Sequence, residues 1–304
     1  MTDVAGAVRP PEGREAHVSE RARRGAKLGV GESRAGAIAL GAAAWLVALL
    51  WIFPFAWMVF TSFKTEEDAA SQSLHHGLSF GRYSDVSHST EGTLSLGTAF
   101  TNSLVVVLVS TLIVMLLALP AAYALAIRPV PKWRDVLFFF ISVKFLPVVA
   151  SIFPIYVYAE KWNLIGTRQI LIILYIAINL PLAIWMLRSF FMEVPRELIE
   201  AAEIDGTNLF NQLRSVIVPI AAPGIAATAL LCVIFAWNEY FYALQLNFAN
   251  ASTMPQWVIG NVSTRGNFLA KLSAASLIAC LPVVIAGWAA QKRMIRGLSM
   301  GAIK

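Results

Sequence analysis

Charge is what this sequence has least of. Only 14% of its 304 residues are Asp, Glu, Lys or Arg, and 58% are hydrophobic, whereas an average soluble domain is about one-quarter charged. Because the deficit extends along the whole chain, it excludes an ordinary soluble domain and predicts a polytopic protein of the lipid bilayer. The net charge of +6 is then no sign of nucleic-acid binding, since Lys and Arg in membrane proteins mark the cytoplasmic loops.

Cysteines and the motifs of enzymes are equally scarce. Cys232 and Cys280 fall in apolar segments, which predicts two buried thiols without a disulfide or a metal. The sequence has no G-x-x-x-x-G-K-[ST] loop for phosphate and no HExxH, CxxC or Ser/His/Asp arrangement. We therefore expect no catalytic residue, no metal site and no cofactor bound by this chain, so any ATP hydrolysis must come from another subunit.

What the sequence does have is six apolar segments. Each is long enough for a helix to cross the hydrocarbon core, which takes about 20 residues. Prolines lie inside several of them, which packed membrane helices tolerate because neighbouring helices re-satisfy the freed backbone groups. The predicted fold is an all-α integral membrane protein with six transmembrane helices. Their expected bounds are 37–62, 99–127, 135–158, 167–189, 223–246 and 272–291.

The basic residues predict the orientation of these helices. The tail before the first span, the loops after the second and fourth spans and the C-terminal tail hold 17 Lys and Arg, against 6 in the alternate loops. The positive-inside rule then places both termini in the cytoplasm, and an even number of spans agrees. The expected organisation is an Arg-rich cytoplasmic tail 1–36, a membrane domain 37–291 and a cytoplasmic tail 292–304.

The cytoplasmic loop 195–223 reads as two short helices separated by a glycine. Pro195 suits the first turn of a helix, and the negative charge of Glu200 is favourable near that end. Leu198, Ala201 and Ala202 share one face at i, i+3, i+4 spacing, and two of them are small enough for close packing. The first helix of the loop is therefore expected to present this face to a neighbour.

The second helix of the loop begins after Gly206, which is expected to end the first helix in a left-handed conformation. Thr207 or Asn208 can cap it, and Pro219 and Pro223 close it. Its expected apolar stripe consists of Leu209, Phe210, Leu213 and Ile217. The pattern alone leaves two alternatives open, an amphipathic pair lying on the membrane surface or a docking element for a partner protein.

A family resemblance distinguishes the two. The spacing EAA-x-x-DG-(x12)-P-x-x-x-P, from Glu200 to Pro223, resembles the EAA motif of the permease subunits of ABC importers of the carbohydrate-uptake, maltose permease-like type. The resemblance covers about 40–304 and implies the type I importer fold with a coupling helix that inserts into the ATPase. The residues that it assigns to coupling are Glu200, Ala201, Ala202, Asp205, Gly206, Phe210 and Pro219.

The C-terminal end carries a second part of the resemblance. The sequence RGLSMGAIK at 296–304 looks like the RGL-x-x-GAxK tail of the maltose-type subunit, which implies that the tail contacts the ATPase. The residues concerned are Arg296, Gly297, Gly301 and Lys304.

The resemblance also implies partners and a substrate class. The expected partners are an ABC ATPase dimer that binds ATP and Mg, a second homologous permease and an extracytoplasmic solute-binding protein, in a bacterial cell membrane. Segments 142–148, 234–244 and 271–304 look like sorbitol/mannitol permeases, which favours a sugar or a sugar alcohol. The alternatives are an importer for another small solute, a stand-alone secondary transporter and a membrane scaffold.

Polar residues inside the spans are candidates for the translocation path. Lys144 lies in the third span, at a cost of about 2.5–3.5 kcal/mol on insertion scales, so it should face an aqueous cavity or a carboxylate such as Glu239. The two lie at different depths, so a direct pair stays open. Hydrogen-bonding and aromatic groups suit a sugar or polyol path, although they also serve as interhelical contacts. The further candidates are Asn179, Trp237, Asn238 and Tyr240.

Overall fold

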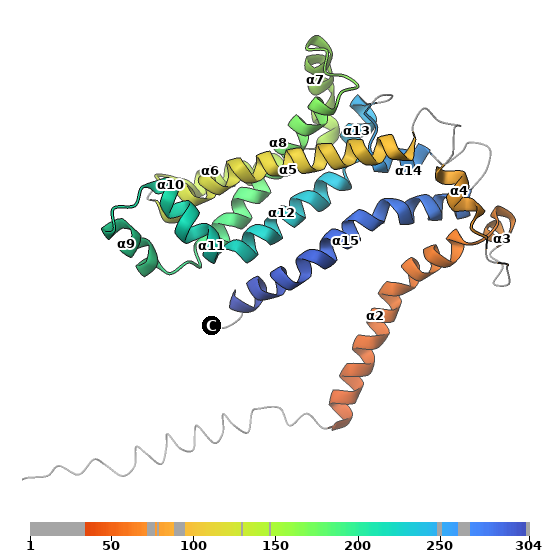
Figure 1. The fold of residues 1–304 in the computed structure, drawn as a ribbon, viewed down its shortest axis with the longest axis horizontal. Helices are drawn as coiled ribbons and strands as arrows, with labels where there is room; N and C mark the ends of the chain where they lie inside the picture. The colour runs from red at the N-terminus through yellow and green to blue at the C-terminus, as the bar shows by residue number, and fades with distance from the viewer. Residues whose placement is uncertain are drawn as a thin grey trace, which may run out of the picture. The chain divides into compact units, whose positions relative to one another are not determined.

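The computed structural model describes residues 34–71, 77, 79–87, 95–128, 130–145, 147–247, 251–260 and 268–301, with side chains within 36–291. The regular elements in these ranges are all helices (Figure 1). The chain divides into two compact units, Met1–Trp57 and Met58–Lys304.

The described part of the first unit is a single helix, the greater part of α2 (Arg34–Ser62). Its apolar side chains are exposed all round: Trp45 is 71% exposed and Trp51 is 72% exposed. A helix that is apolar on every face is typical of a membrane span, so we expect these side chains to face lipid or a partner helix.

The second unit is a bundle of helices and short connecting elements. Its core consists of long helices that pack side by side, with α5 lying along α8 and α12 lying between α8 and α15. The elements are α3 (Glu66–Ala70), α4 (Gly81–Ser87), α5 (Leu96–Ile127), α6 (Trp133–Lys144), α7 (Val148–Lys161), α8 (Arg168–Phe191), α9 (Arg196–Ile204), α10 (Leu209–Gln212), the π-helix η1 (Leu213–Ile217), α11 (Val218–Ile220), α12 (Ala222–Trp237), α13 (Phe241–Leu246), α14 (Met254–Gly260) and α15 (Leu269–Gly301).

Four helices in the described residues are long and apolar enough to cross a membrane. They are Gly36–Ser62, Leu96–Ile127, Arg168–Phe191 and Leu269–Gln291, which agree with the first, second, fourth and sixth predicted spans. Two bent pairs of helices bring the number to six if each pair counts as one span. The third and fifth spans are therefore not the straight helices that the sequence predicts.

The third predicted span, 135–158, is broken. Its halves α6 and α7 meet at 87°, with Phe145 ending α6 and Pro147 standing at the cap of α7. Pro147 has no backbone N–H to bond within a continuing helix, which is consistent with a new helix beginning at this point. Pro120 and Pro181, in contrast, lie inside α5 and α8 without interrupting them.

The fifth predicted span, 223–246, ends early. Helix α12 stops at Trp237, Asn238 is its C-cap, and α13 begins only at Phe241. The Glu239 carboxylate accepts hydrogen bonds from the backbone N–H groups of Tyr242 at 2.9 Å and Ala243 at 3.3 Å. These are N–H groups of a first helical turn, which lack partners within their own helix, so a separate helix starts here. At its other end α12 makes an angle of 85° with Leu209–Ile220.

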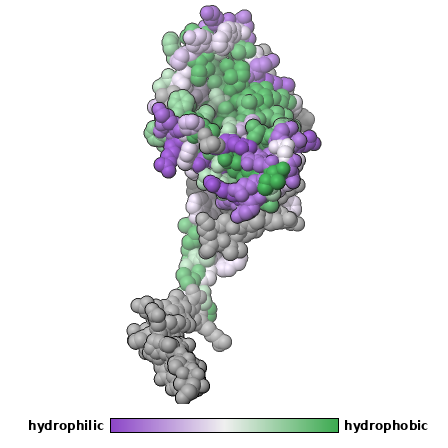
Figure 2. All heavy atoms as spheres, turned by 90° about the vertical axis from the view of Figure 1, so that its left-hand side faces the viewer, coloured by the Kyte–Doolittle hydropathy of each residue, from purple (hydrophilic) through white to green (hydrophobic). Residues whose placement is uncertain are grey.

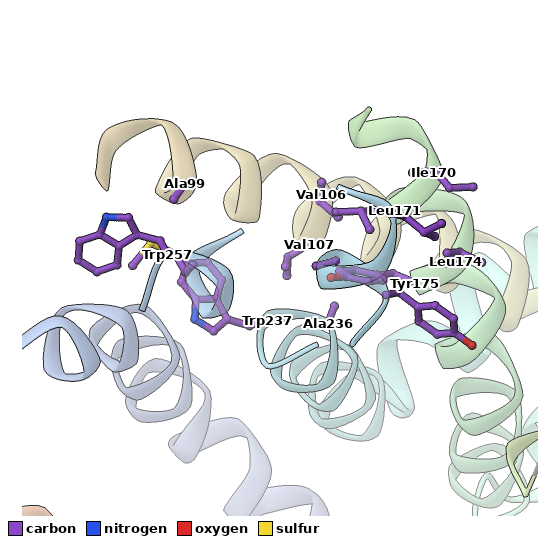
Figure 3. Packing of buried hydrophobic residues seen from close by; sticks show 14 of the residues in the cluster. Ala99, Val106, Val107, Ile170, Leu171, Leu174, Tyr175, Ala236, Trp237 and Trp257 are labelled. Atoms are coloured by element: carbon purple, nitrogen blue, oxygen red, sulfur yellow. The ribbon is translucent and has the colours of Figure 1, made fainter. Parts of the chain in front are cut away.

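One hydrophobic cluster joins α5, α8, α12 and α15 (Figure 3). Small side chains such as Ala99, Ala274 and Ala275 are fully buried in it and allow close approach of the helices. Trp237 lies in the same cluster, only 5% exposed, and its indole N–H donates to the Ala279 carbonyl at 3.0 Å. This bond joins the end of α12 to α15.

The two thiols differ in environment. Cys232 is buried in α12, as the sequence predicts, whereas Cys280 is exposed on α15. The prediction for Cys280 is wrong because this part of α15 faces outward, with its neighbours Leu281 and Val284 56% and 63% exposed.

The start of α15 is capped by a carboxylate from α3. Glu66 accepts hydrogen bonds from the backbone N–H groups of Ala270 at 3.1 Å and Lys271 at 2.9 Å. Arg82 of α4 lies 3.9 Å from the same carboxylate. A carboxylate at a helix N-terminus satisfies orphan donors and interacts favourably with the helix dipole, so α3 and α4 fix the position of α15.

We predict that Glu66→Gln lowers the thermal stability of the protein purified in detergent. Loss of the charged cap should cost about 0.5–2 kcal/mol. Glu67→Gln is the matched control, because Glu67 has the same charge in the same turn of α3 and is exposed. Equal unfolding temperatures for the two variants would contradict the capping role.

The contact between α8 and α12 depends on a glycine. Gly224 is buried, and a Cβ placed there would overlap the ring of Phe190. We predict that Gly224→Ala destabilises the protein by about 1–3 kcal/mol through overpacking. Gly287→Ala in α15 is the control, because a Cβ there meets nothing within 4 Å, and it should leave the unfolding temperature unchanged or raised.

Candidate functional site

The loop between α8 and α12 folds as the sequence predicts at its first helix. Helix α9 begins after Pro195 and ends at Ile204. Gly206 has φ +72°, a left-handed conformation that glycine adopts without strain. The backbone N–H of Thr207 donates to the Ala202 carbonyl at 3.1 Å, and its hydroxyl donates to the same carbonyl at 2.7 Å. The end of α9 is thus firmly defined.

The face of α9 expected to pack against a neighbour is divided between two sides of the helix. Ile199 and Ala202 are buried, at 5% and 6% exposure, whereas Leu198 is 46% exposed and Ala201 is exposed as well. Ala202 therefore pairs with Ile199 and not with Leu198 and Ala201. Ile199 is thus the apolar side chain that anchors α9 in the hydrophobic core, and its burial removes apolar area from water.

The second helix of the loop is less regular than predicted. The side chain of Asn208 caps α10 by accepting from the N–H of Asn211 at 2.8 Å. A π-helical segment, Leu213–Ile217, follows at once. A widened turn before Pro219 accommodates the proline ring, which in a regular α-helix would clash with the carbonyl four residues earlier.

The expected apolar stripe of this helix is divided between two sides. Ile217 is fully buried, but Leu209 and Phe210 are 56% and 67% exposed. Together with Leu198 and Ile204 of α9, which is 87% exposed, they form what we call the outer face. Figure 2 views this end of the bundle directly and shows apolar residues among polar ones. Exposed apolar groups with a polar rim are typical of a protein-binding surface.

Most residues of the EAA-like sequence are exposed on the loop that carries the outer face. Glu200, Asp205 and Gly206 are exposed, as is Pro219. Of the seven residues expected to take part in coupling, only Ala202 points into the protein. The structure thus brings the other six to the surface of one loop, at the same end of the bundle as the C-terminal ends of α5 and α8 (Figure 1).

A cavity lies beneath α9. It has a volume of about 740 Å³ and an aromatic–cation contact in its wall, with the Arg188 guanidinium 3.9 Å from the centre of the Trp133 ring. Arg188 Nε also donates to the Leu125 carbonyl at 3.1 Å. The lining residues are Leu125, Ala126, Ile127, Arg128, Trp133, Arg188, Phe191, Met192, Val194, Arg196, Ile199, Glu200 and Glu203.

A polar network bridges α5 to the loop. Gln212 is 1% exposed, and its Nε2 donates to the Ile199 carbonyl of α9 at 3.2 Å. Its Oε1 accepts from the Tyr123 hydroxyl and from Arg128 Nη2, the latter at 3.3 Å. Arg128 Nη1 lies 3.0 Å from a carboxylate oxygen of Glu203 on α9. We call Tyr123, Arg128, Glu203 and Gln212 the latch.

The sequence alone does not predict the latch. Arg128 is one of the basic residues that mark orientation, and no motif singles out Tyr123 or Gln212. The signal available in the sequence was the side-chain amide of Gln212, which stands between apolar positions of its helix. In the structure this amide is buried. Its partners are 84 and 89 residues away in the sequence, so only the structure brings them together.

The candidate path residues lie around the break between α12 and α13. Asn238 is exposed, and its Nδ2 donates to the Ile234 carbonyl at 2.8 Å. Tyr240 is half-buried, while Trp237 is buried against α15. The Glu239 carboxylate caps α13, and its backbone carbonyl accepts from the Tyr175 hydroxyl of α8 at 3.4 Å.

Lys144 and Asn179 lie apart from this group of four. Lys144 is exposed at the end of α6, with Nζ 5.8 Å from the centre of the Phe235 ring. None of the ion pairs among the described side chains joins Lys144 to Glu239. Asn179 is 2% exposed in α8, and its Nδ2 donates to the Tyr175 carbonyl at 3.0 Å.

The C-terminal residues expected to contact an ATPase are only partly described. Arg296, Gly297 and Gly301 belong to the last turns of α15, whose side chains beyond Gln291 are outside the described ones. Lys304 lies outside the described residues, as does most of the tail 1–36.

Comparison with known proteins gives a family and a fold. Residues 115–294 match the family described as the binding-protein-dependent transport system inner membrane component. The trehalose/maltose transport system permease protein MalG of Thermococcus litoralis is 31% identical over 85% of this chain and 94% of its own length. A probable ABC transporter permease protein, y4oR, of Sinorhizobium fredii is 32% identical over 85% of this chain and 92% of its own length. The melibiose/raffinose/stachyose import permease protein MelC of Bacillus subtilis is 30% identical over 85% and 94%.

Solved structures share the architecture. A chain of a bacterial alginate ABC transporter, crystallised with an alginate pentasaccharide-bound periplasmic protein, has a TM-score of 0.60 at 16% identity and covers 83% of this chain and 92% of that one. A chain of the MetNI methionine ABC transporter has a TM-score of 0.51 at 18% identity and covers 66% and 95%. At these identities the likeness shows the fold alone, the transmembrane fold of type I ABC importers.

The family match covers more than half of the chain, and relatives above 30% identity align with most of it. The relatives are permeases and not enzymes, and ATP hydrolysis is carried out by a separate subunit. The chain therefore belongs to the binding-protein-dependent transport system inner membrane components, as a permease subunit of an ABC transporter.

Proposed function

We propose that this chain is one of two permease subunits of a bacterial ATP-driven importer for a sugar or a sugar alcohol. Support for the substrate class comes from relatives whose names specify trehalose and maltose, or melibiose, raffinose and stachyose. Another relative is named for sulfoquinovosyl glycerol, which joins a sugar to a polyol. The family membership argues against a stand-alone secondary transporter.

Within this class we favour a polyol of the sorbitol or mannitol type. The favoured choice rests on the segments 142–148, 234–244 and 271–304, which look like sorbitol/mannitol permeases. An importer for another small solute is the alternative. Uptake by the assembled transporter of a panel of polyols, disaccharides and unrelated small solutes would distinguish the two.

The outer face carries the proposed coupling to ATP hydrolysis. It presents four exposed apolar side chains on α9 and α10, held in place by the left-handed turn at Gly206. An apolar helical face of this kind fits a hydrophobic groove on a partner. We propose that the loop docks into a cleft of an ABC ATPase dimer, which binds ATP and Mg. Glu200, Ala201, Asp205 and Phe210 would lie at this contact, whereas Ala202 supports α9 from inside.

The remaining partners follow from the same assembly. A second homologous permease would complete the translocation path, and an extracytoplasmic solute-binding protein would deliver the solute. The distribution of Lys and Arg supports a multi-pass orientation with both termini in the cytoplasm, on the side of the ATPases. The tail that contains Arg296, Gly297, Gly301 and Lys304 would then reach the ATPase as well.

The break between α12 and α13 supports a place for the solute path. Irregular backbone at membrane depth is tolerated only where protein buries it or where it lines a water-filled cavity. At this break Asn238 is exposed and Tyr240 is half-buried, so both are placed to line the path. Lys144 is exposed at the other broken span. We assign a supporting role to Trp237, Asn179 and the Glu239 carboxylate, which bond to neighbouring backbone groups.

The docking proposal predicts that Phe210→Asp abolishes recovery of the ATPase with this chain in a mild-detergent pull-down. A charge in an apolar contact leaves an unpaired buried group at the interface. Phe80→Asp is the matched control, because Phe80 is equally exposed, at 67%, on the segment before α4. Pull-down through an N-terminal tag keeps the C-terminal tail free. Equal recovery of the ATPase with both variants would contradict the docking proposal.

The left-handed turn gives a second prediction. Gly206→Ala imposes a strain of about 1–2 kcal/mol on the turn, and we expect transport in proteoliposomes to fall several-fold. Gly166→Ala is the matched control, because Gly166 has φ +77° and likewise meets nothing within 4 Å. Both variants should lose similar stability, but only Gly206→Ala should change the solute transported per ATP hydrolysed. An equal ratio in the two would contradict the role of the turn in coupling.

A further inference from the structure

Helix α9 has only limited support from the helices that it follows. It is joined to α8 through residues 192–195 and is anchored in the core by Ile199, and an open pocket of about 740 Å³ lies between its remaining inner surface and the ends of α5 and α8. A helix that borders a cavity has room to tilt when a force acts on its outer face. Such a tilt would absorb part of any motion that α9 receives before the motion reaches the spans.

The helices beyond the cavity form a rigid pair. Helices α5 and α8 pack along each other and are joined near both ends. Arg168 Nε donates to Asn102 Oδ1 at 2.7 Å at one end, and Arg188 Nε donates to the Leu125 carbonyl at 3.1 Å at the other. Whatever moves the end of α5 therefore moves α8 with it.

The latch crosses from this pair to α9. Gln212 contacts both sides, since its amide nitrogen donates to the Ile199 carbonyl of α9 while its oxygen accepts from Tyr123 of α5. Arg128, at the end of α5, adds an ion pair to Glu203 of α9 at 3.0 Å. The contacts to Ile199 and Glu203 lie one turn apart on α9, so together they oppose rotation as well as displacement of that helix.

The buried half of the latch, Tyr123 and Gln212, resists stretching, whereas Arg128 and Glu203 are partly exposed. Gln212 is 1% exposed and Tyr123 is 5% exposed, so neither can exchange its partner for water. Breaking such a bond leaves a buried polar group without a partner, which costs more than the loss of a solvent-exposed hydrogen bond. The latch is consequently a stiff connection across a compliant space.

We infer that the latch transmits motion of the docking loop to the α5–α8 pair, and that Tyr123, Arg128 and Gln212 are positioning residues for coupling. This inference rests on the proposed function, in which α9 receives motion from an ATPase. Without the latch, α9 still docks through its outer face but tilts over the cavity. ATP hydrolysis then continues while less solute crosses the membrane per ATP.

The inference can be tested with the assembled transporter in proteoliposomes. Gln212→Ala removes the centre of the latch, and Tyr123→Phe removes one hydroxyl with little change of shape. We expect both to retain the ATPase and its hydrolysis and to lower the solute transported per ATP by about 2- to 30-fold, the range of couplings carried by such networks. The double variant should be no worse than Gln212→Ala alone, because the two residues act through one connection.

Matched controls separate this effect from general damage. Asn211→Ala removes an exposed amide from the neighbouring position of α10, and Tyr158→Phe removes the hydroxyl of a tyrosine that is 56% exposed. Both should keep the wild-type ratio. A purely structural role would lower hydrolysis and transport together and leave their ratio unchanged, so the ratio tests transmission itself.

A distance measurement provides the second readout. Spin labels at Ala124 on α5 and Glu197 on α9, in a background without Cys232 and Cys280, report the separation of the two helices. With the latch intact the distance distribution should stay narrow with and without ATP, and Tyr123→Phe should broaden it. An unchanged transport ratio with an unchanged distribution in Tyr123→Phe would overturn the inference. Failure of the wild-type chain to bind any ATPase would instead overturn the proposed function.

Discussion

The hydrocarbon core offers the backbone no hydrogen-bond partner, and the rest of this structure depends on that constraint. Long helices satisfy it over most of the chain. At the break after α12, polar side chains bond to the backbone: Asn238 donates to the Ile234 carbonyl, and the Glu239 carboxylate accepts from the first N–H groups of α13. This break therefore keeps its backbone groups bonded without a continuous helix.

Buried polar groups also need partners in the loop from α9 to α11. Its two sides differ: the outer face exposes apolar side chains, and the inner side buries apolar side chains together with one amide, that of Gln212. An exposed apolar face lowers its free energy when a partner covers it, whereas a buried amide such as Gln212 requires a fixed geometry to keep its bonds. In the proposed docking the loop would bind outward through a non-directional interaction, while Gln212 adds directional bonds on its inner side.

Local chemistry explains which features could be predicted from the sequence. Apolar length identified four spans, and Gly206 and Asn208 identified the end of α9 and the start of α10, because each depends on adjacent residues. The bends at 145–147 and 238–240 were not predicted. A proline or a glutamate can lie inside a helix or at its end, and packing decides which position it takes. The sequence does not show that Ala202 is buried with Ile199 while Leu198 and Ala201 stay exposed, since Ile199 and Leu198 are nearly equivalent in a helical pattern. The latch depends on contacts 84 and 89 residues apart, which no local pattern contains.

A coupling element must meet two mechanical requirements that oppose each other. It must release and rebind its partner through a surface that tolerates small displacements, and it must pass force to the membrane helices without deforming. Apolar contacts suit the first requirement because they do not depend on direction. Hydrogen bonds to buried groups suit the second because their energy falls steeply with angle and distance. A loop built only of apolar contacts would slip over the cavity, and a loop built only of polar contacts would bind its partner in a single geometry. In the proposed coupling, the division between the outer face and the latch would meet both requirements within one short segment.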